Sequence, residues 1–392
     1  MKNYKQLLLL LILFVGFSAN GQENINAILT SIDENNPTIA ALRAHFDYVK
    51  ADARAGLLPP NPSIEGGRFP AVQGAGIKYA WGVSQSFEFP TVYAKRGQIA
   101  RTTEKYADVS FKAERQEVLL HAKLSILEYI HTKLLIKEYT IREEFAQNML
   151  TIIQKRLDAG DATAMDLNYA KLRIVEMNQQ RISAANQSNL LLKRISALNG
   201  NVPISIVDTI IILQELPPRN ILGAKYFVSD SRVIALEYMN ELAEQNRQLV
   251  KQQGLPELSI GFQSEQTDAE HFRGFMAGVS IPLWGNAGKS KAAKIKVNAT
   301  QAEKQNQVEM LQLEYDEIYL KAISVKNQLD ELKEALNSFN NIDLMQRALE
   351  AGEISVINLY NELAFLYDLT DKINELELEY AKYYAELHRF DL

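Results

Sequence analysis

Acidic and amide side chains recur at two copies of one short motif, and their types suggest attraction of cations rather than catalysis. The first copy spans residues 156–167 and the second spans residues 348–359, which is 192 positions later. The matched polar pairs are Asp158/Glu350, Asp161/Glu353 and Asp166/Asn358. Carboxylates gathered in a ring favour cations and repel anions. Solvated charge near helix ends explains the same residues equally well.

Other groups that could do chemistry are sparse in this sequence. Asp268, Glu270 and His271 could bind a metal, but they lie in a polar turn where a solvated loop is the simpler interpretation. His121 and His131 are ten positions apart, which does not give a ligand pair on one helical turn. With no catalytic constellation and no phosphate-binding loop, we expect no enzyme activity, no cofactor and no resident metal.

Charge and cysteine content exclude further classes. The formal charge is −6, and it becomes about −8 when Lys2 and Lys5 are removed with the signal peptide predicted below. A nucleic-acid partner is therefore not expected, because it needs a basic footprint. The sequence has no cysteine, so it has no disulfide framework, no thiolate site and no cysteine for a bacterial lipid anchor.

The repeated motif predicts the tips of two helical hairpins. Gly160 and Gly352 stand where a left-handed residue ends a helix. Thr163 can cap the return helix, with Asp166 three positions later as its capping-box partner, and Ser355 occupies the same place in the second copy. These residues could serve only to turn the chain. The same turn is also the surface that a partner would meet.

Long helices lead to and from the two tips. Apolar residues recur every seven positions through residues 99–141 and 308–336, which is the pattern of coiled-coil packing. We expect helices over 93–157 and 289–349, with return helices over 163–198 and 357–389. At 1.5 Å per residue, the first arm would be roughly 100 Å long.

Four strands are predicted ahead of the long helices, two in each half. Period-two alternation is clearest over residues 77–89 and recurs over 258–263 and 275–283, with another strand near 62–69. An apolar face opposite a polar or small one is typical of a membrane β-barrel, although a half-buried sheet shows the same alternation. The residues predicted to face lipid are Tyr79, Trp81, Phe87, Phe89, Phe275 and Trp284.

The domain organisation follows from the duplication. Residues 1–21 have the charged start, apolar run and small-residue end of a signal peptide. The first repeat spans 22–200 with its β-hairpin at 61–89, and the second spans 231–392 with its hairpin at 257–283. Residues 201–230 connect the repeats, with some extended structure expected. The fold class is mainly α with a β membrane part.

Four strands cannot close a membrane barrel, which needs at least about eight. An open sheet edge is not tolerated in lipid, because its unpaired backbone groups find no water. The chain is therefore expected to share a barrel with copies of itself. Three copies would supply twelve strands, and a homotrimer would carry the long helices as a coiled-coil helical barrel on the same axis.

This combination resembles the TolC family of outer-membrane efflux proteins. The resemblance covers essentially the whole mature chain. It rests on the signal peptide, on Asn36-Pro37 opening the first helix, and on residues 57–62 with the sequence Leu-Leu-Pro-Pro-Asn-Pro. The pattern Gly-x-x-x-x-x-Asp/Asn-Leu at both tips completes it. Residues 57–62 and the compact length favour the heavy-metal branch (CusC/CzcC-like), whose frequent lipidated cysteine is absent here.

The resemblance implies a passive duct through the outer membrane of a Gram-negative bacterium and across the periplasm. Its partners would be outer-membrane lipid, a periplasmic adaptor protein and an inner-membrane pump of RND or ABC type. Its cargo would be heavy-metal cations, or else the cargo of a multidrug or type I secretion duct. A non-porous coiled-coil envelope protein is the alternative from another class.

The same resemblance assigns roles at the tips. The adaptor would contact the periplasmic entrance at Gly160, Asp166, Leu167, Gly352, Asn358 and Leu359. In a trimer, Asp158, Asp161, Glu350 and Glu353 would place about twelve carboxylates around that entrance.

Overall fold

The computed structural model describes residues 20–72, 76–208, 210–339 and 342–392. The described part of the chain is mainly helical and contains a four-stranded antiparallel sheet, which confirms the combination of helices and strands in the predicted fold class. It divides into two compact units. Among the described residues, unit 1 lies within 20–41, 114–227 and 313–392, and unit 2 lies within 42–113 and 228–312. Each unit therefore takes segments from both halves of the sequence.

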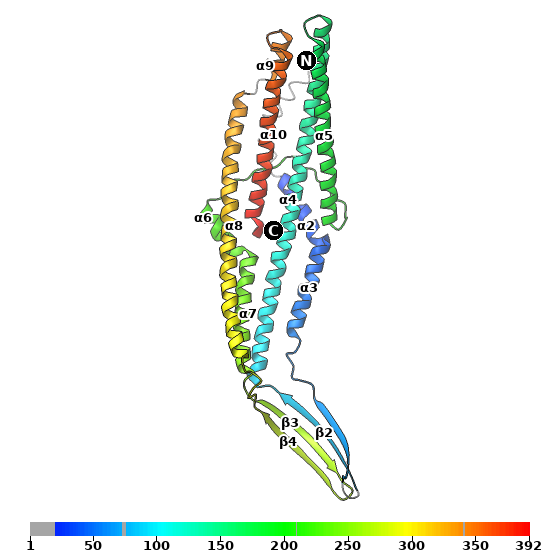
Figure 1. The fold of residues 1–392 in the computed structure, drawn as a ribbon, viewed down its shortest axis with the longest axis vertical. Helices are drawn as coiled ribbons and strands as arrows, with labels where there is room; N and C mark the ends of the chain where they lie inside the picture. Colours follow the sequence, from blue (N-terminus) through cyan, green and yellow to red (C-terminus); the bar gives the residue numbers. More distant parts are fainter. Residues whose placement is uncertain (1–19, 73–75, 209, 340–341) are drawn as a thin grey trace. The chain divides into compact units, whose positions relative to one another are not determined.

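The sheet lies in unit 2 and follows the sequence order of its strands (Figure 1). Its strands are β1 (Ser63–Pro70), β2 (Ile77–Phe87), β3 (Glu257–Gln266) and β4 (His271–Ser280). All neighbours are antiparallel, and β2 pairs with β3 although the two come from different repeats. The edge strands are thus β1 and β4.

The strand register sorts the side chains onto two faces. Val83 lies opposite Ile64 on one side and Phe262 on the other, and Phe262 lies opposite Phe275. Successive strand residues point to opposite faces, so these four apolar side chains share one face. The other face carries mainly small and polar residues from the central strands: Lys78, Ala80, Gly82, Ser84, Ser86, Ser259, Gly261, Gln263 and Glu265.

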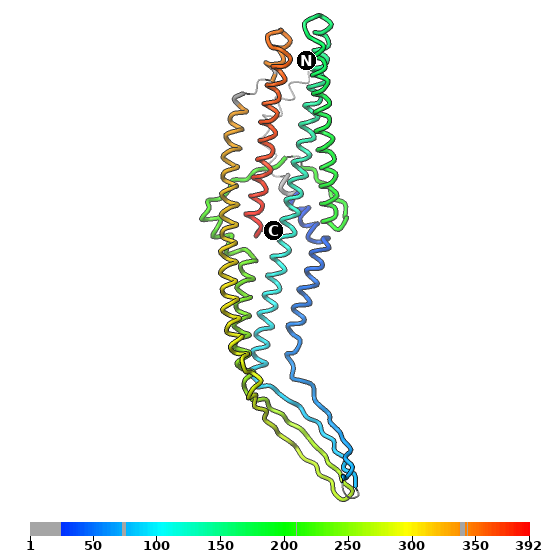
Figure 2. Tube along the Cα trace, viewed as in Figure 1, coloured from blue at the N-terminus to red at the C-terminus, as the bar shows by residue number. Residues whose placement is uncertain are grey.

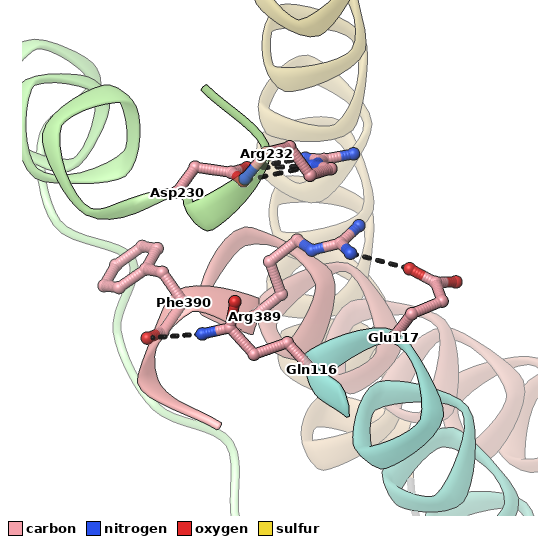
Figure 3. Close-up of polar contacts among 6 residues, drawn as sticks. All are labelled: Gln116, Glu117, Asp230, Arg232, Arg389 and Phe390. Carbon is pink, nitrogen blue, oxygen red and sulfur yellow. Dashed lines mark hydrogen bonds and ion pairs between the residues drawn. The ribbon is translucent and has the colours of Figure 1, made fainter. Parts of the chain in front are cut away.

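Helical segments complete unit 2. They are most of α3 (Pro37–Arg54), α7 (Ser231–Gln252), and the first parts of α4 (Pro90–Asp158) and α8 (Lys289–Phe339). Asp230 begins α7 as its N-cap, because its carboxylate accepts the backbone N–H of Arg232 at 2.8 Å and also pairs with the Arg232 guanidinium (Figure 3). Between helices, the Lys304 ammonium lies 2.6 Å from the Glu237 carboxylate.

Unit 1 holds the remaining helices. They are α2 (Asn20–Asn35), α5 (Ala164–Leu198), most of α6 (Arg219–Ser229), α9 (Ile342–Glu350), α10 (Val356–Leu387) and the short 3-10 helix η1 (Arg389–Asp391), together with the second parts of α4 and α8. Helices α8 and α10 pack through a cluster that includes Tyr315, Leu329 and Tyr380. Helices α4 and α10 pack through Leu120, Leu127 and Ala385.

The C-terminal segment of unit 1 is fixed to α4 by polar contacts (Figure 3). The side-chain amide of Gln116 donates to the Phe390 carbonyl oxygen at 3.0 Å. The Arg389 guanidinium donates to the Glu117 carboxylate at 2.6 Å. The last residues are therefore an integral part of the α4–α10 packing.

The connecting segment contains a helix that was not predicted. No strand is found in the part of 201–230 that the structure describes, and residues 219–229 form helix α6. The reason is that Leu222 and Tyr226, four residues apart, are both buried in the α8–α10 cluster, which needs one helical turn between them. Hydroxyls of Tyr315, Tyr319 and Tyr380 donate to carbonyl oxygens of residues 214–219 and hold the segment in place.

Other predicted boundaries are close but not identical. The expected helix over 289–349 is described as α8 and α9, with residues 340–341 outside the described part. Strand β4 begins at His271, earlier than expected, because its pairing with β3 continues to Gln266. Strand β2 ends at Phe87, before Phe89. Almost all of the predicted signal peptide, and residues 73–75 of the first hairpin turn, lie outside the described residues.

In the described part of the chain, every helix is too short or too polar to cross a bilayer by itself.

Candidate functional site

The two predicted hairpin tips have the same backbone geometry. Gly160 and Gly352 take positive φ angles of 83° and 77°. The amide N–H of Asp161 donates to the Arg156 carbonyl at 2.8 Å, and that of Glu353 donates to the Ala348 carbonyl at 2.8 Å. These six-to-one bonds define Schellman caps, in which only glycine avoids the steric cost of the left-handed conformation.

Each return helix begins with a side-chain cap at the same position of the motif. Thr163 accepts the backbone N–H of Asp166 at 3.2 Å, and the Asp166 carboxylate accepts the Thr163 N–H at 2.9 Å, which completes a capping box. Ser355 accepts the backbone N–H of Asn358 at 3.1 Å. The Asp166 side chain thus has a structural role in starting α5, whereas Asn358 contributes only its backbone N–H to the cap of α10. Their contact with an adaptor stays a prediction.

The two tips pack against one another within unit 1, at the same end of the unit (Figure 2). Met149 and Ile153 of α4, Leu349 of α9 and Leu359 of α10 are all fully buried in one cluster. The Arg156 guanidinium also donates to the Leu349 carbonyl at 2.6 Å. The first tip therefore satisfies an end carbonyl of the second, and the chain presents both tips as one surface.

This packing changes what the predicted contact residues can offer a partner. Leu359 is 0% exposed and Leu167 is half-buried beside it, so both contribute to the cluster between the tips. Gly160, Gly352 and Asn358 are exposed. Sequence reasoning missed the burial of Leu359 because its partners come from α4, about 200 residues earlier in the chain.

The four predicted carboxylates lie on the exposed surface of the tips. Asp158, Asp161, Glu350 and Glu353 are all exposed. The Gln154 side-chain amide donates to Asp158 at 2.9 Å, and Gln346 donates to Glu350 at 3.1 Å, again 192 positions apart. The second tip thus repeats both the negative charges of the first tip and the hydrogen bond that one of these charges accepts. A ring of these charges in an assembly stays a prediction.

A polar and aromatic cluster behind the tips was missed by sequence reasoning. The Arg142 guanidinium makes two hydrogen bonds to Asp371 and lies 4.5 Å from the centre of the Tyr367 ring. Burial raises the pKa of Tyr367, and of Tyr360 nearby, to about 12, so both hydroxyls stay neutral. The cluster joins α4 to α10, and no local sequence motif marks a contact between residues that are so far apart in the sequence.

The second candidate surface is the apolar face of the sheet. Tyr79, Trp81, Phe87 and Phe275 share this face by register. Ring contacts run across three strands, from Trp81 to Phe262 at 5.6 Å and from Phe262 to Phe275 at 5.5 Å. Trp81 is 51% exposed and Phe275 is 91% exposed, so unit 2 leaves this face uncovered.

Two of the predicted lipid-facing residues lie beyond the strands. Phe89 follows the end of β2, and Trp284 follows the end of β4 in an irregular segment; both are exposed. Their place after the strand ends fits aromatic residues of an interfacial girdle. The lipid contact of all six residues stays a prediction.

The polar turn between β3 and β4 gives no sign of a metal centre. The Thr267 backbone N–H and hydroxyl donate to the Glu270 carbonyl, at 2.9 and 3.3 Å, and so organise the turn internally. Throughout residues 20–72, 76–208, 210–339 and 342–392, no three His, Cys, Asp or Glu side chains are grouped to hold a metal ion.

Comparison with known proteins identifies the fold. No protein-family model and no curated protein matches the sequence. Among solved structures, the chain is similar to CusC, described for conformational changes that accompany folding and transmembrane channel formation, with a TM-score of 0.75 and 13% identity over 94% of this chain and 92% of that chain. It is also similar to the outer-membrane channel OprN, with a TM-score of 0.78 and 13% identity over 94% of this chain and 89% of that one.

A third similar structure is the open state of the outer-membrane channel MtrE from Neisseria gonorrhoeae, with a TM-score of 0.71 and 13% identity over 94% of this chain and 88% of that chain. The chain therefore has the fold of these outer-membrane channels over nearly its whole length.

Proposed function

We propose that this chain belongs to the TolC family and is one subunit of a homotrimeric outer-membrane channel of an efflux system. In this proposal, three copies combine their sheets into one twelve-stranded barrel, and their helices extend the channel into the periplasm. The channel is passive, and its transport energy comes from an inner-membrane pump that it reaches through a periplasmic adaptor.

The observation that carries this proposal is the sheet of unit 2. Its apolar face exposes Trp81 and Phe275, and monomeric soluble proteins rarely leave such a continuous apolar surface in water. Its edge strands β1 and β4 have free hydrogen-bonding groups, which lipid does not tolerate. Closure with copies of the same chain resolves both problems, whereas a non-porous coiled-coil protein leaves the apolar face without a role.

The tips support the periplasmic end of the proposal. Rigid caps at Gly160 and Gly352 present both turns as one surface, which suits docking of an adaptor. The four exposed carboxylates at Asp158, Asp161, Glu350 and Glu353 favour cations as cargo, in keeping with heavy-metal efflux. The same duct with a different pump would serve multidrug efflux or type I secretion.

The test is single-channel recording of the purified, detergent-extracted protein in a planar bilayer, after its mass in detergent has been measured by light scattering. A salt gradient gives the cation/anion permeability ratio. We expect trimers with discrete, cation-selective openings. Heat-denatured protein at the same detergent concentration is the control for leaks made by detergent.

Three results would contradict the proposal. A folded protein that stays monomeric in detergent, or one that remains in the aqueous phase without detergent, has no shared barrel. A folded trimer without conductance is examined further by adding osmotic stress and by cysteine accessibility of the tips. Lack of conductance with fully accessible tips would exclude the duct.

A further inference from the structure

The apolar face of the sheet carries two positive charges for which the chain supplies no partner. Arg68 of β1 lies opposite Tyr79. Arg273 of β4 lies opposite Ser264, which in turn lies opposite Trp81. Both arginines therefore share the face of Tyr79 and Trp81. Both are exposed, and among the described residues neither guanidinium has a hydrogen bond or an ion pair.

The carboxylates of the sheet lie on its other face. Glu65, Glu257 and Glu265 alternate with the apolar residues of their strands, and none of the described strand residues on the apolar face is Asp or Glu. Lys78 shares the carboxylate face, and its ammonium lies 2.7 Å from the Glu265 carboxylate. The formal charge of the chain is −6, so a positive face does not follow from its overall composition. The sheet thus pairs its lysine internally and leaves both arginines to an external anion.

Both arginines lie near the end of the sheet where its strands turn. Arg68 is two residues before the end of β1, and Arg273 is two residues after the start of β4. Each is thus about 7 Å from the turn end of its strand. The opposite ends of the central strands lead to helices, since β2 is followed by α4 and β3 is preceded by α7. In the proposed channel the helices extend into the periplasm, which puts the turns and both arginines at the outer surface of the membrane.

A lipid-facing guanidinium at this depth needs a particular kind of neighbour. A cation on the outer face of a membrane barrel is costly at the middle of the bilayer and much less costly near its boundary. At that boundary it meets lipid headgroups. The planar fork of a guanidinium matches a phosphate group and forms two charge-assisted hydrogen bonds with it. A phosphorylated headgroup is therefore the neighbour that these two side chains fit.

We infer that the apolar face of each sheet binds a glycolipid whose headgroup carries two phosphates, one held by Arg68 and the other by Arg273. The inference rests on the proposed function, which places this face in the outer membrane. The arginines stand on the two outermost of the four strands, so their backbones are separated by three strand spacings, about 14 Å. Because side chains stand roughly perpendicular to a sheet, the guanidinium groups suit two separate phosphates better than a single one.

The residues between the arginines suit the sugar part of such a headgroup. Tyr79 and Trp81 are 50% and 51% exposed, and their amphipathic rings are favoured where apolar and polar surroundings meet. Gln266 of β3, opposite Tyr79, is exposed and offers an amide that can donate to or accept from sugar hydroxyls. Farther from the turns, Phe262 and Phe275 continue the same face toward the acyl chains.

The test measures binding of defined lipids to the purified trimer after detergent washing has removed its endogenous lipid. The probes are bis-phosphorylated lipid A, its monophosphorylated form and phosphatidylglycerol, each titrated and counted per trimer by native mass spectrometry. We expect the bis-phosphorylated lipid to bind most tightly. Replacement of both arginines, Arg68→Gln with Arg273→Gln, should weaken its binding about tenfold or more, because two charge-assisted phosphate contacts are lost.

Lys78→Gln is the matched control. It removes a positive charge from the same end of the sheet but on the opposite face, where Lys78 is paired with Glu265. We expect it to bind the bis-phosphorylated lipid as the wild-type protein does. Arg68→Lys with Arg273→Lys keeps both charges and loses the planar fork, so its affinity should lie between those of the wild type and the Gln variant. Light scattering and bilayer conductance show whether each variant still forms the channel.

Three results would overturn this inference. The first is unchanged binding in the double Gln variant, or an equal loss in Lys78→Gln. The second is equal affinity of the wild-type trimer for the bis-phosphorylated and monophosphorylated lipids, a comparison that needs no variant to fold. The third is equally tight binding of phosphatidylglycerol, or displacement of the lipid by an equal concentration of inorganic phosphate, either of which would indicate a general anion surface. All three leave conducting trimers, whereas a monomeric wild-type protein without conductance contradicts the proposed function itself.

Discussion

Arg142 and Asp371 form a bidentate ion pair, with N–O distances of 2.9 and 2.6 Å, between residues 229 positions apart. The Arg142 side chain is only 4% exposed, whereas the Asp371 side chain is 34% exposed. The pair joins α4 to α10 between the apolar contacts of Leu127 and those of the tips. The two partners therefore have unequal environments, and their removal should have unequal effects.

Replacement of Asp371 by Ala should destabilise unit 1 by about 2 kcal/mol, because the buried Arg142 charge loses its partner. This value is below that for a fully buried pair, since Asp371 is partly solvated. Arg142→Met should cost less than half as much, because the Asp371 carboxylate can turn to water. Thermal unfolding followed by circular dichroism compares the two variants. Equal losses would contradict the unequal burial of the partners.

Glu386 should make the protein less stable as the pH rises. Its burial, together with the nearby Glu314 carboxylate, raises the pKa of Glu386 in the folded state. When the pKa of a carboxyl group is higher in the folded state than in the unfolded state, the group costs no stability at a pH below the unfolded-state pKa. As the pH rises above that value towards the folded-state pKa, the unfolded chain releases the proton more readily, and the free energy of unfolding falls. Glu386→Gln should thus raise the melting temperature at pH 7 to 8 and have little effect below pH 4. A change in melting temperature that is the same at every pH would exclude the ionisation of Glu386 as its cause.

The tip glycines should be intolerant of a side chain for conformational reasons alone. Nothing lies within 4 Å of a Cβ atom built on Gly160 or Gly352, so the cost of alanine there is that of the left-handed backbone, about 1 kcal/mol. Asn should cost less than Ala at either position, since it enters this conformation more readily. Melting temperatures of the four single variants give the order, and Ala tolerated better than Asn would contradict it.

The two faces of β4 should respond differently to charge. Phe275→Lys places an ammonium on the apolar face, which costs about 2–4 kcal/mol near the middle of a bilayer. Met276→Lys places the same group on the opposite face of the same strand, and we expect normal insertion. The fraction of protein recovered in the outer-membrane fraction measures the difference. Equal recovery would argue against lipid contact of the apolar face.

The carboxylates at the tips should set ion selectivity. Asp161→Asn combined with Glu353→Gln removes two exposed negative charges per chain while it preserves side-chain size. We expect the cation/anion permeability ratio to fall several-fold, with the effect reduced at high salt by screening. Asp268→Asn in the turn between β3 and β4 is the control. An unchanged ratio in the double tip variant would exclude the acidic entrance.

Much of the fold could be predicted because its strongest signals are local. Glycine, Thr163 and Ser355 mark the tips, and seven-residue spacing marks the long helices. What could not be predicted depends on distant partners. Helix α6 forms because Leu222 and Tyr226 find the α8–α10 cluster, and Leu359 is buried because α4 covers it. The Arg142–Asp371 pair has no local signal at all.

The interleaving of the two halves has a consequence for biogenesis. Because α4 packs on α9 and α10, the ion pair of Arg142 with Asp371 and the contacts of Met149 and Ile153 with Leu349 and Leu359 cannot form until nearly the whole chain has been delivered. Contacts between residues so far apart in the chain make folding slow, because the entropic cost of closing the long loop arises before the stabilising contacts have formed. Helix α4 must therefore remain for some time with the apolar residues that α10 will cover exposed to solvent. We expect the folding of this protein to depend on a holding chaperone that covers these residues until α10 is complete.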